Sequence, residues 1–496
     1  MPNEIPVSPM SADRFRSVLP PDRFDAFERS AREARELLHG RAVWNVNSTA
    51  RGGGVVELLG PLVAYARGTG VDARWSVIDG TPEFFAVTKR IHNRLHGTLG
   101  DGLALDRESR RIYEQVLAEN ARALTARIRP GDIAILHDPQ TAGLVETMRA
   151  AGAGVIWRCH VGLDTPNELA RQAWDFLLPY LLDADVYVFS RQSFAWEGLD
   201  RDRIVVIAPT IDVFAPKNED LDPETVRAIL DAGGLVPGNG GHRPATFRHR
   251  DGTPGRVERR ATMVQDQPLR PQTPVVLQVS RWDALKDPHG VIQGFAEHVA
   301  PGTGAHLVYA GPAVDAVDDD PEGAHVLAAA IALRDRLPDE PRGRVHLATL
   351  PMKDSEENAV LVNALQRHAR VIVQKSLAEG FGLTVAEAMW KARPVVASRI
   401  GGIQDQIVDG ESGVLLDDPR DLAAYGAAVT GLLSNPERAT RMGKRARERI
   451  QDRFVSVRSL FDYFAVIRDR LLPGPDRGQV NESTRSATES TIRDAR

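Results

Sequence analysis

The stretch from Ser376 to Trp390 constrains the fold more than any other part of the chain. It follows an apolar run, residues 369–373, that predicts a buried parallel strand, and it opens a helix. Gly380 and Gly382 stand between strand and helix, where the missing side chains let backbone amides approach a ligand. This order is typical of a strand-to-helix turn in a doubly wound α/β domain, whose helix N-terminus favours a phosphate.

Two carboxylates flank this turn. Glu379 precedes the helix, and Glu387 lies eight residues further on, inside it. Both repel an anion, but both can accept hydrogen bonds from hydroxyls on either side of a diphosphate, while Leu383 and Thr384 offer backbone at the helix N-terminus. The pattern therefore predicts a sugar on one side and a ribose on the other. Taken alone, the turn is equally compatible with two solvated glutamates on an ordinary α/β fold.

Two further features favour a ligand site. The apolar strand Val275–Val279 is followed by two cations, Arg281 and Lys286, and a third apolar strand, 394–398, runs into Gly401-Gly402. Ligands of open α/β sheets bind outside the carboxyl ends of the strands. All these residues are predicted to lie at that edge.

Composition excludes several classes of function. The chain has 496 residues with 42% hydrophobic and 26% charged residues, as in an ordinary globular protein, and its length indicates two domains. A net charge of −5 argues against nucleic acid as a partner. The single cysteine, Cys159, excludes an internal disulfide. Without a signal-peptide core or an apolar run of about 20 residues, the chain is expected to be cytoplasmic and not bound to a membrane.

Alternating short apolar strands and helices predict two doubly wound domains joined by a hinge at Pro209–Pro216. The first domain is predicted at 1–212 and the second at 213–454. A long charged helix is predicted from about Pro436 to Leu472. Residues 473–496 have few large apolar side chains and are expected to be disordered.

A polar segment at about 233–274 interrupts the second domain. It is rich in Gly, Pro and Arg and has almost no hydrophobic periodicity. We interpret it as an insertion that forms a mobile surface loop.

No metal site is predicted. Asp318-Asp319-Asp320 precedes a helix and is interpreted as a surface turn. His92 and His96 have the spacing of zinc ligands on a helix, but no third ligand stands at a recognisable distance in the sequence.

The glutamates of the turn, together with the upstream Arg281 and Lys286, resemble the retaining glycosyltransferases of the GT-B fold from about Arg41 to Phe464. This resemblance implies two Rossmann-like domains that face each other across a cleft, with the last helix, about 455–472, packed back on the first domain. The finer resemblance is to the glycosyl-transferring trehalose synthases. The segments that carry it are 47–55, 92–96, 137–140, 157–164 and 286–291.

The resemblance assigns a role to each candidate residue. The donor nucleotide sugar is expected to be bound by Gly53, Gly54, Gly382, Leu383, Thr384 and Glu387. The catalytic set is Arg281, Lys286, Glu379 and His160. The acceptor sugar is expected to contact Asn47, Asp138, Gln140 and Arg158. No cofactor and no metal are expected, because the cations take over neutralisation of the leaving diphosphate.

The function predicted from this resemblance is transfer of glucose from a nucleoside diphosphate to free glucose, with retention, to form trehalose. The alternatives are a retaining trehalose phosphorylase, another retaining GT-B hexosyltransferase, and a sugar-nucleotide sensor without activity. The expected partners are small molecules. The nucleobase, the direction of the reaction, the acceptor and the oligomeric state, a homodimer included, stay open.

Overall fold

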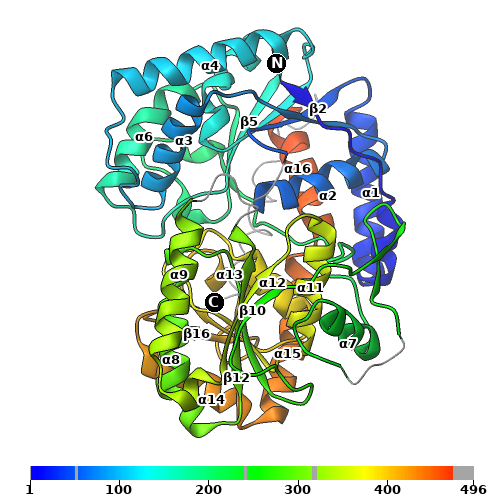
Figure 1. Ribbon diagram of the computed structural model, residues 1–496. Coiled ribbons are helices and arrows are strands. Elements are labelled where there is room, and N and C mark those ends of the chain that lie inside the picture. Colours follow the sequence, from blue (N-terminus) through cyan, green and yellow to red (C-terminus); the bar gives the residue numbers. More distant parts are fainter. Residues whose placement is uncertain (1, 51–53, 239–242, 315–320, 473–496) are drawn as a thin grey trace.

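A computed structural model of the chain describes residues 2–50, 54–238, 243–314 and 321–472. The chain forms two lobes, each built on a seven-stranded sheet between layers of helices (Figure 1). In the first lobe the strand order is β1-β3-β2-β4-β5-β6-β7, and every neighbouring pair is parallel except β1 with β3. The strands are β1 (Asn3–Glu4), β2 (Ala42–Asn47), β3 (Asp72–Val77), β4 (Ile133–His137), β5 (Gly154–Cys159), β6 (Val186–Phe189) and β7 (Ile204–Val206).

Both faces of this sheet are buried, which explains why its strands are almost continuously apolar. Along β2 the side chains alternate, so that Val43 packs in one hydrophobic cluster and Trp44 in another. The helices of this lobe are α1 (Pro21–Leu37), α2 (Gly54–Gly68), α3 (Pro82–Leu95), α4 (Arg107–Thr125), α5 (Val145–Ala150) and α6 (Glu168–Leu181).

The second sheet repeats the plan with the order β10-β13-β12-β11-β14-β15-β16, parallel except for β10 with β13. Its strands are β10 (Thr262–Val264), β11 (Val275–Val279), β12 (His306–Pro312), β13 (Val345–Leu350), β14 (Val371–Gln374), β15 (Val395–Ser398) and β16 (Val414–Leu416). Its helices are α7 (Pro223–Ala232), α8 (Pro288–His298), α9 (Pro321–Arg336), α10 (Asp339–Arg342), α11 (Ser355–His368), α12 (Leu383–Trp390), α13 (Ile403–Gln406), α14 (Leu422–Leu433) and α15 (Pro436–Arg453). The predicted fold class, two doubly wound α/β domains, is confirmed.

The segment 233–274 differs from the mobile loop that its composition suggested. It contains a hairpin of β8 (Thr246–Arg248) and β9 (Pro254–Arg256), and its strand β10 completes the edge of the second sheet. Phe247 is buried, and the Glu357 carboxylate accepts hydrogen bonds from the amides of Glu258 and Arg259 at 2.7 and 2.6 Å. Side-chain anchors of this kind leave no hydrophobic period in the sequence.

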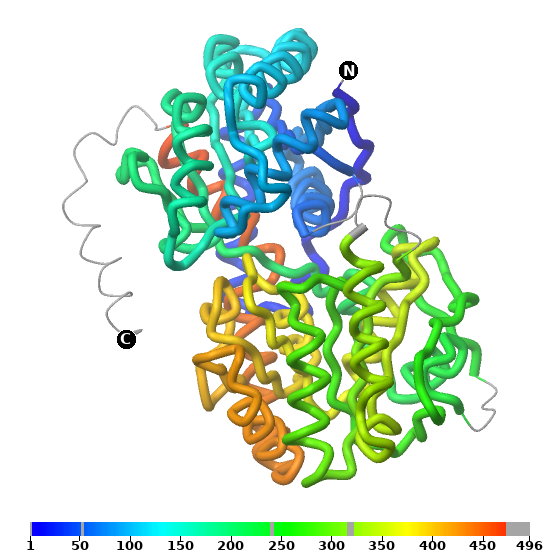
Figure 2. Tube along the Cα trace, turned by 60° about the vertical axis from the view of Figure 1, so that its left-hand side comes forward, coloured from blue at the N-terminus to red at the C-terminus, as the bar shows by residue number. Residues whose placement is uncertain are grey.

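The predicted long helix at 436–472 is interrupted. It consists of α15 and α16 (Ser456–Val466), with a last turn at Ile467–Leu471. Between the helices, Val455 forms a β-bridge with Ile211 of the hinge, and this extended backbone breaks the helix. Beyond the break, α16 packs against α1 and α2 of the first lobe, and the red end of the trace returns to that lobe in Figure 2.

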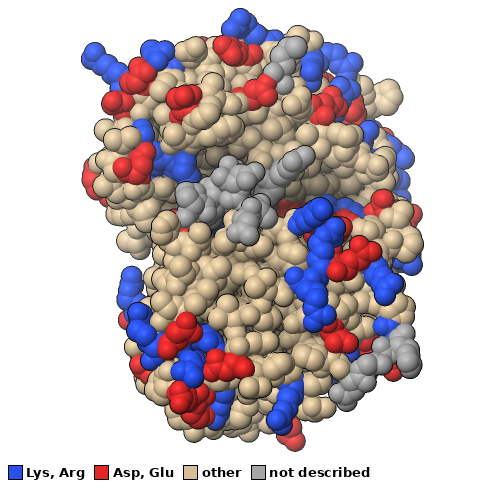
Figure 3. All heavy atoms as spheres, in the orientation of Figure 1, with Lys and Arg blue, Asp and Glu red and all other residues tan. Residues whose placement is uncertain are grey.

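One hydrophobic cluster joins the two domains. It includes Leu59 of α2, Ile211 of the hinge, Phe381 beside α12 and Leu460 of α16. Side chains of both charges lie on both lobes of the face in Figure 3. Of the helices in the described part of the chain, none combines the length and the apolarity needed to cross a bilayer.

Candidate active site

The turn after β14 leads into the N-terminus of α12, where the sequence predicts a phosphate. The α12 helix begins at Leu383, and its N-cap, Gly382, has a φ of 82°, in the left-handed region that favours glycine. Gly54, the first residue of α2, lies across the domain boundary, and a Cβ built on it would be 3.6 Å from Leu383 Cδ1. Two helix N-termini, one from each domain, therefore lie close together. Gly53 and Asp318–Asp320 are outside the described residues.

Glu387 lies in α12 and is only 2% exposed. Its Oε1 is 3.5 Å from Lys217 Nζ, and Lys217 also pairs with Glu57 of α2 at 2.8 Å. The other oxygen, Oε2, has no hydrogen-bond partner among the described residues. Burial raises the pKa of Glu387, and the charge of Lys217 opposes that shift. A buried carboxylate with one open oxygen is ready to accept a hydrogen bond from a ligand hydroxyl.

Lys286 and Glu379 form an ion pair in which Nζ and Oε2 are 2.7 Å apart and both side chains are mostly buried. Lys286 ends a short 3-10 turn, Ala284–Lys286, just beyond β11. Arg281 is more exposed, with 60% of its side chain accessible, and its Nη2 is 2.9 Å from the Asp283 carboxylate. Arg281 and Lys286 thus both lie beyond the carboxyl end of β11. The ion pair between Lys286 and Glu379 links one of these cations to the glutamate that is predicted to bind the sugar.

The loop that carries Lys286 is fixed by buried polar side chains. Gln278 donates from Nε2 to the Lys286 carbonyl at 2.7 Å and accepts from the Lys375 amide at 3.2 Å. The fully buried Lys375 pairs with Asp287, the N-cap of α8. This arrangement holds Lys286 in place against β14, as preorganised electrostatic sites require.

The first domain contributes two stacked histidines. His137 ends β4, and His160 follows β5, with Nδ1 of the first and Nε2 of the second 3.2 Å apart. His137 Nε2 is also 3.2 Å from Asn45 Oδ1. Burial lowers the pKa of His137 to about 3 and that of His160 well below its ordinary value, so both rings are neutral at pH 7. His160 Nδ1 has no hydrogen-bond partner within the described residues.

Asp138 has a strained backbone, with φ 64° and ψ 178°, a region that residues other than glycine rarely adopt. Its Oδ1 accepts a hydrogen bond from the His160 amide at 2.7 Å. Burial raises the pKa of Asp138 to about 7. Strain of this kind persists where the surroundings enforce it, and the bond between the Asp138 carboxylate and the His160 amide fixes the loop that carries His160.

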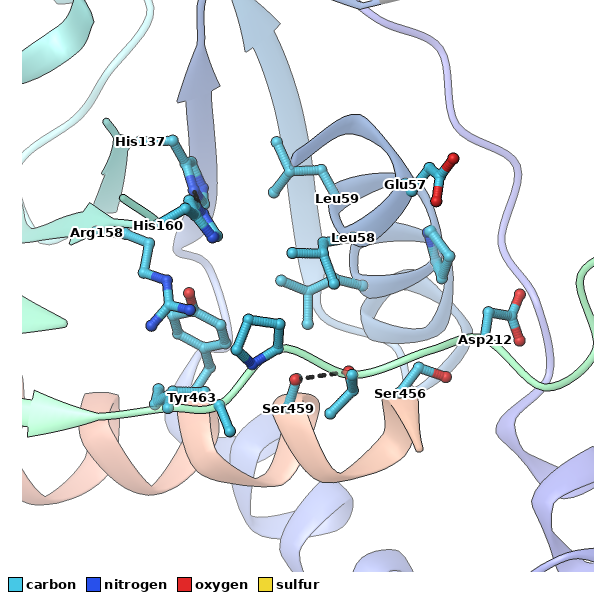
Figure 4. A pocket seen from close by; sticks show the side chains of 16 residues that line it. Glu57, Leu58, Leu59, His137, Arg158, His160, Asp212, Ser456, Ser459 and Tyr463 are labelled. Carbon is cyan, nitrogen blue, oxygen red and sulfur yellow. Dashed lines mark hydrogen bonds between the residues drawn. The ribbon is translucent and has the colours of Figure 1, made fainter. Parts of the chain in front are cut away.

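A pocket lies between α2, the ends of β4 and β5, the hinge and α16 (Figure 4). Arg158 and His160 line it, with Leu59 from α2 and Tyr463 from α16. Arg158 is 2% exposed, and its Nη2 donates to Ser190 Oγ at 3.1 Å. Its Nε and Nη1 have no partner in the described part of the chain, so they are available to a ligand oxygen.

The other residues predicted for the acceptor do not line this pocket. Asn47 is engaged elsewhere, because its Nδ2 donates to the Thr49 carbonyl at 2.7 Å and its Oδ1 accepts from Trp75 Nε1 at 2.8 Å. Gln140 lies in the 3-10 helix Pro139–Leu144 that follows Asp138. The structure therefore brings Arg158 together with His160 and places Asn47 in a supporting role.

Sequence reasoning missed Lys217 and Lys375. The first follows the predicted hinge, and only the folded chain shows that it connects Glu57 with Glu387. The second directly precedes Ser376, where an apolar strand gives way to the turn, and a lysine at the end of a buried strand was the available signal. Searched over the described residues, the structure contains no group of three or more His, Cys, Asp or Glu side chains that could hold a metal ion.

Comparison with known proteins gives two family matches. Residues 45–196 match the family described as "Trehalose synthase, N-terminal domain", and residues 355–449 match "Glycosyl transferases group 1".

Individual proteins agree with these matches. The chain is 37% identical over 435 residues to a trehalose synthase of Rubrobacter xylanophilus, covering 87% of this chain and 91% of that protein. It is 26% identical over 404 residues to a trehalose phosphorylase of Pleurotus sajor-caju, covering 74% of this chain and 50% of that protein. The structure resembles an α,α-trehalose 6-phosphate synthase from Burkholderia multivorans with a TM-score of 0.61 at 17% identity, covering 86% of this chain and 98% of that one.

Proposed function

Since the chain belongs to the trehalose synthase family and is a glycosyltransferase of the GT-B fold, we propose that it transfers glucose from a nucleoside diphosphate to free glucose and forms trehalose. The observation that carries this proposal is the joint placement of the Lys286–Glu379 pair and the buried Glu387 around the N-terminus of α12. A cation, a helix N-terminus and two carboxylates that accept hydrogen bonds from hydroxyls match a diphosphate flanked by two sugars.

The nucleotide is held by the second domain. Oε2 of Glu387 accepts a hydrogen bond from a ribose hydroxyl, and the backbone amides around Leu383 and Thr384 face the phosphates. Lys217 lies beside both Glu387 and Glu57, and its charge opposes the rise in pKa that burial imposes on the ribose-binding carboxylate.

Departure of the nucleoside diphosphate builds negative charge on the phosphate. Lys286 and Arg281 stabilise that charge from fixed positions, which lowers the barrier without reorganisation at the moment of transfer. Glu379 holds the hydroxyls of the transferred glucose, and its bond to Lys286 ties the sugar site to the leaving group. The acceptor attacks from the face that the phosphate leaves, and the phosphate takes its proton, so the anomeric configuration is retained.

The acceptor is a neutral polyol, and the first domain offers groups suited to it. Among the described residues, Nδ1 of His160 and both Nε and Nη1 of Arg158 have no hydrogen-bond partner, while His137 orients the His160 ring through its own bonds to His160 and Asn45. We place the acceptor next to His160, whose carbonyl oxygen is 3.6 Å from a Cβ built on Gly380 of the donor turn.

A donor panel tests the proposal. Purified protein is incubated with glucose and ADP-, GDP- or UDP-glucose or glucose 1-phosphate, and the products are separated by chromatography and their anomeric linkage read by NMR. We expect α,α-trehalose and a nucleoside diphosphate from at least one nucleotide sugar. Turnover of glucose 1-phosphate alone would replace the proposal with phosphorylase activity, the second candidate, which the likeness to a trehalose phosphorylase favours.

A further inference from the structure

A second set of contacts joins the two domains beside the candidate active site. Its centre is Asp164, in the loop that begins with His160, and Arg191, which follows β6. Asp164 Oδ1 accepts from Arg191 Nη1 at 2.5 Å, and Oδ2 accepts from the Gly401 amide at 2.8 Å. Asp164 and Arg191 belong to the first domain and Gly401 to the second, so one carboxylate spans the boundary.

The second domain contributes further side chains and backbone groups to this contact. Gln404 Nε2 donates to Asp164 Oδ2 at 3.0 Å. Arg191 Nη1 donates to the Gly401 carbonyl at 2.6 Å, and its Nε is 3.1 Å from Asp405 Oδ2. The Arg191 side chain is 15% exposed and that of Asp164 33%, so the pair is better shielded than a surface ion pair. We call Asp164, Arg191, Gly401, Gln404 and Asp405 the interdomain clamp.

The clamp is in direct contact with the turn that holds Glu379. Gly401 has a φ of 47°, and a Cβ on it would lie 1.9 Å from the Glu379 carbonyl oxygen, so no other residue fits there. The Gly402 amide donates to the Gly380 carbonyl at 2.9 Å. Any shift of the clamp on the second domain therefore moves the peptide of Glu379.

On the first domain the same contacts fix the loop of His160. Asp164 lies four residues after His160, whose amide is bonded to Asp138 and whose carbonyl faces Gly380. This loop is held at one end by Asp138 and at the other by the clamp. The distance between His160 and Glu379 across the site therefore depends on the Asp138 bond and on the clamp.

We propose that Asp164 and Arg191 are positioning residues that couple domain contact to catalysis by holding the His160 loop against the Glu379 turn. They touch neither the nucleotide site at Glu387 nor the cations, and they act through Gly401 and Gly402. Because the coupling is to sugar transfer, this inference rests on the proposed function. Its kinetic consequence is a loss of turnover without loss of nucleotide affinity.

The first test separates these two quantities. Asp164→Asn keeps the shape but removes the charge that binds Arg191, and Arg191→Ala removes the partner. Each should lower kcat by about 100-fold, as expected when reacting groups are displaced by about 1 Å. Calorimetry with the free nucleoside diphosphate should give an unchanged Kd. Arg191→Lys keeps the charge without the two-pronged geometry, and its kcat should lie between that of the wild type and that of Arg191→Ala.

The matched control is Arg171→Ala, which removes an exposed arginine of the same domain from its pair with Glu197. It should leave kcat and Kd unchanged. An unchanged kcat in Asp164→Asn and Arg191→Ala would overturn the inference, and so would a parallel loss of nucleotide affinity, because the clamp would then serve the nucleotide site or the fold as a whole.

A second measurement does not depend on the reaction. Small-angle scattering of the ligand-free protein should show a larger radius of gyration in the Asp164→Ala, Arg191→Ala double variant than in the wild type, with thermal unfolding showing intact domains. An unchanged radius of gyration would overturn the proposal that the clamp holds the two domains together. If the wild-type protein forms no trehalose from any donor, the proposed function fails, while scattering still decides whether the clamp holds the domains together.

Discussion

The two domains present different chemistry at their facing edges. The second domain presents buried charges in pairs: Lys286 with Glu379, Lys217 with Glu387 and Lys375 with Asp287. The first presents the neutral histidines 137 and 160, Asp138, whose pKa burial raises to about 7, and the buried Arg158, whose hydrogen bond goes to the Ser190 hydroxyl. Fixed charges suit a ligand that carries a diphosphate, and neutral donors and acceptors suit one that carries only hydroxyls.

This contrast assigns a different step of the reaction to each domain. If the charged side binds the donor, its variants should alter nucleotide binding and departure of the leaving group. If the neutral side binds the acceptor, its variants should alter acceptor use and pH dependence and leave the nucleotide alone.

The largest expected effect is on the charged side. Lys286→Ala and Arg281→Ala should each lower turnover by about 10²–10³-fold, the usual loss when one preorganised electrostatic donor is removed. Lys286 should give the larger loss, because it is the more buried and also orients Glu379. Steady-state kinetics measures this, with Lys353→Ala, an exposed lysine of the same domain, as control. Near-native turnover in both variants, with an intact fold, would remove these cations from the mechanism.

A smaller effect is expected in the first domain, where the stability of the fold should depend on pH through Asp138. Because the pKa of Asp138 is raised by burial from 3.8 to about 7, the folded state binds its proton more tightly than the unfolded state. Its contribution to stability is therefore complete below about pH 4 and is lost as the pH rises toward 7. Asp138→Asn cannot ionise, and asparagine tolerates a positive φ.

Denaturant unfolding measures the consequence of that substitution. At pH 8 Asp138→Asn should be more stable than the wild type by about 1–3 kcal/mol, and the difference should vanish near pH 4. A difference that does not change with pH would show that Asp138 is ionised in the folded protein as in water.

The smallest expected effect is that of chelation. The charge of the leaving diphosphate is assigned to Lys286, Arg281 and the N-terminus of α12, so EDTA should not change turnover. Activity is compared before and after dialysis against the chelator. Loss of activity that manganese or magnesium restores would contradict this assignment and would make the charged side a metal site as well.

Much of the fold could be predicted because buried parallel strands leave a direct trace in the sequence. The strand predicted at Val275–Val279 has the same bounds in the structure, and the strand predicted at 394–398 begins one residue later, at Val395. The start of α12 at Leu383 likewise follows from the glycine before it. These features depend on local backbone chemistry.

The remaining features depend on contacts between distant segments. Lys217 gains its role only where the hinge passes between α2 and α12, and the break before α16 exists because Val455 pairs with the hinge at Ile211. Asn47 has the residue type of a sugar ligand, but the neighbouring strand places Trp75 next to it and occupies its side chain. No spacing in the sequence carries such information.

In the proposed site Glu387 serves the nucleotide and Glu379 the transferred sugar. Calorimetry with the free nucleoside diphosphate, on Glu387→Gln and Glu379→Gln, separates these two roles. Glu387→Gln should weaken binding by about 1.5–3 kcal/mol, the contribution of a hydrogen bond to a charged group. Glu379→Gln should leave the affinity unchanged, because the free nucleotide has no sugar for it to hold.

Glu411→Gln is the matched control, since it removes an exposed carboxylate of the same domain from its pair with Arg445 and should leave nucleotide affinity unchanged. Equal losses in Glu387→Gln and Glu379→Gln would contradict the claim, because both carboxylates would then bind the nucleotide. A loss confined to Glu379→Gln would mean that the ligand lies in the opposite direction along the turn.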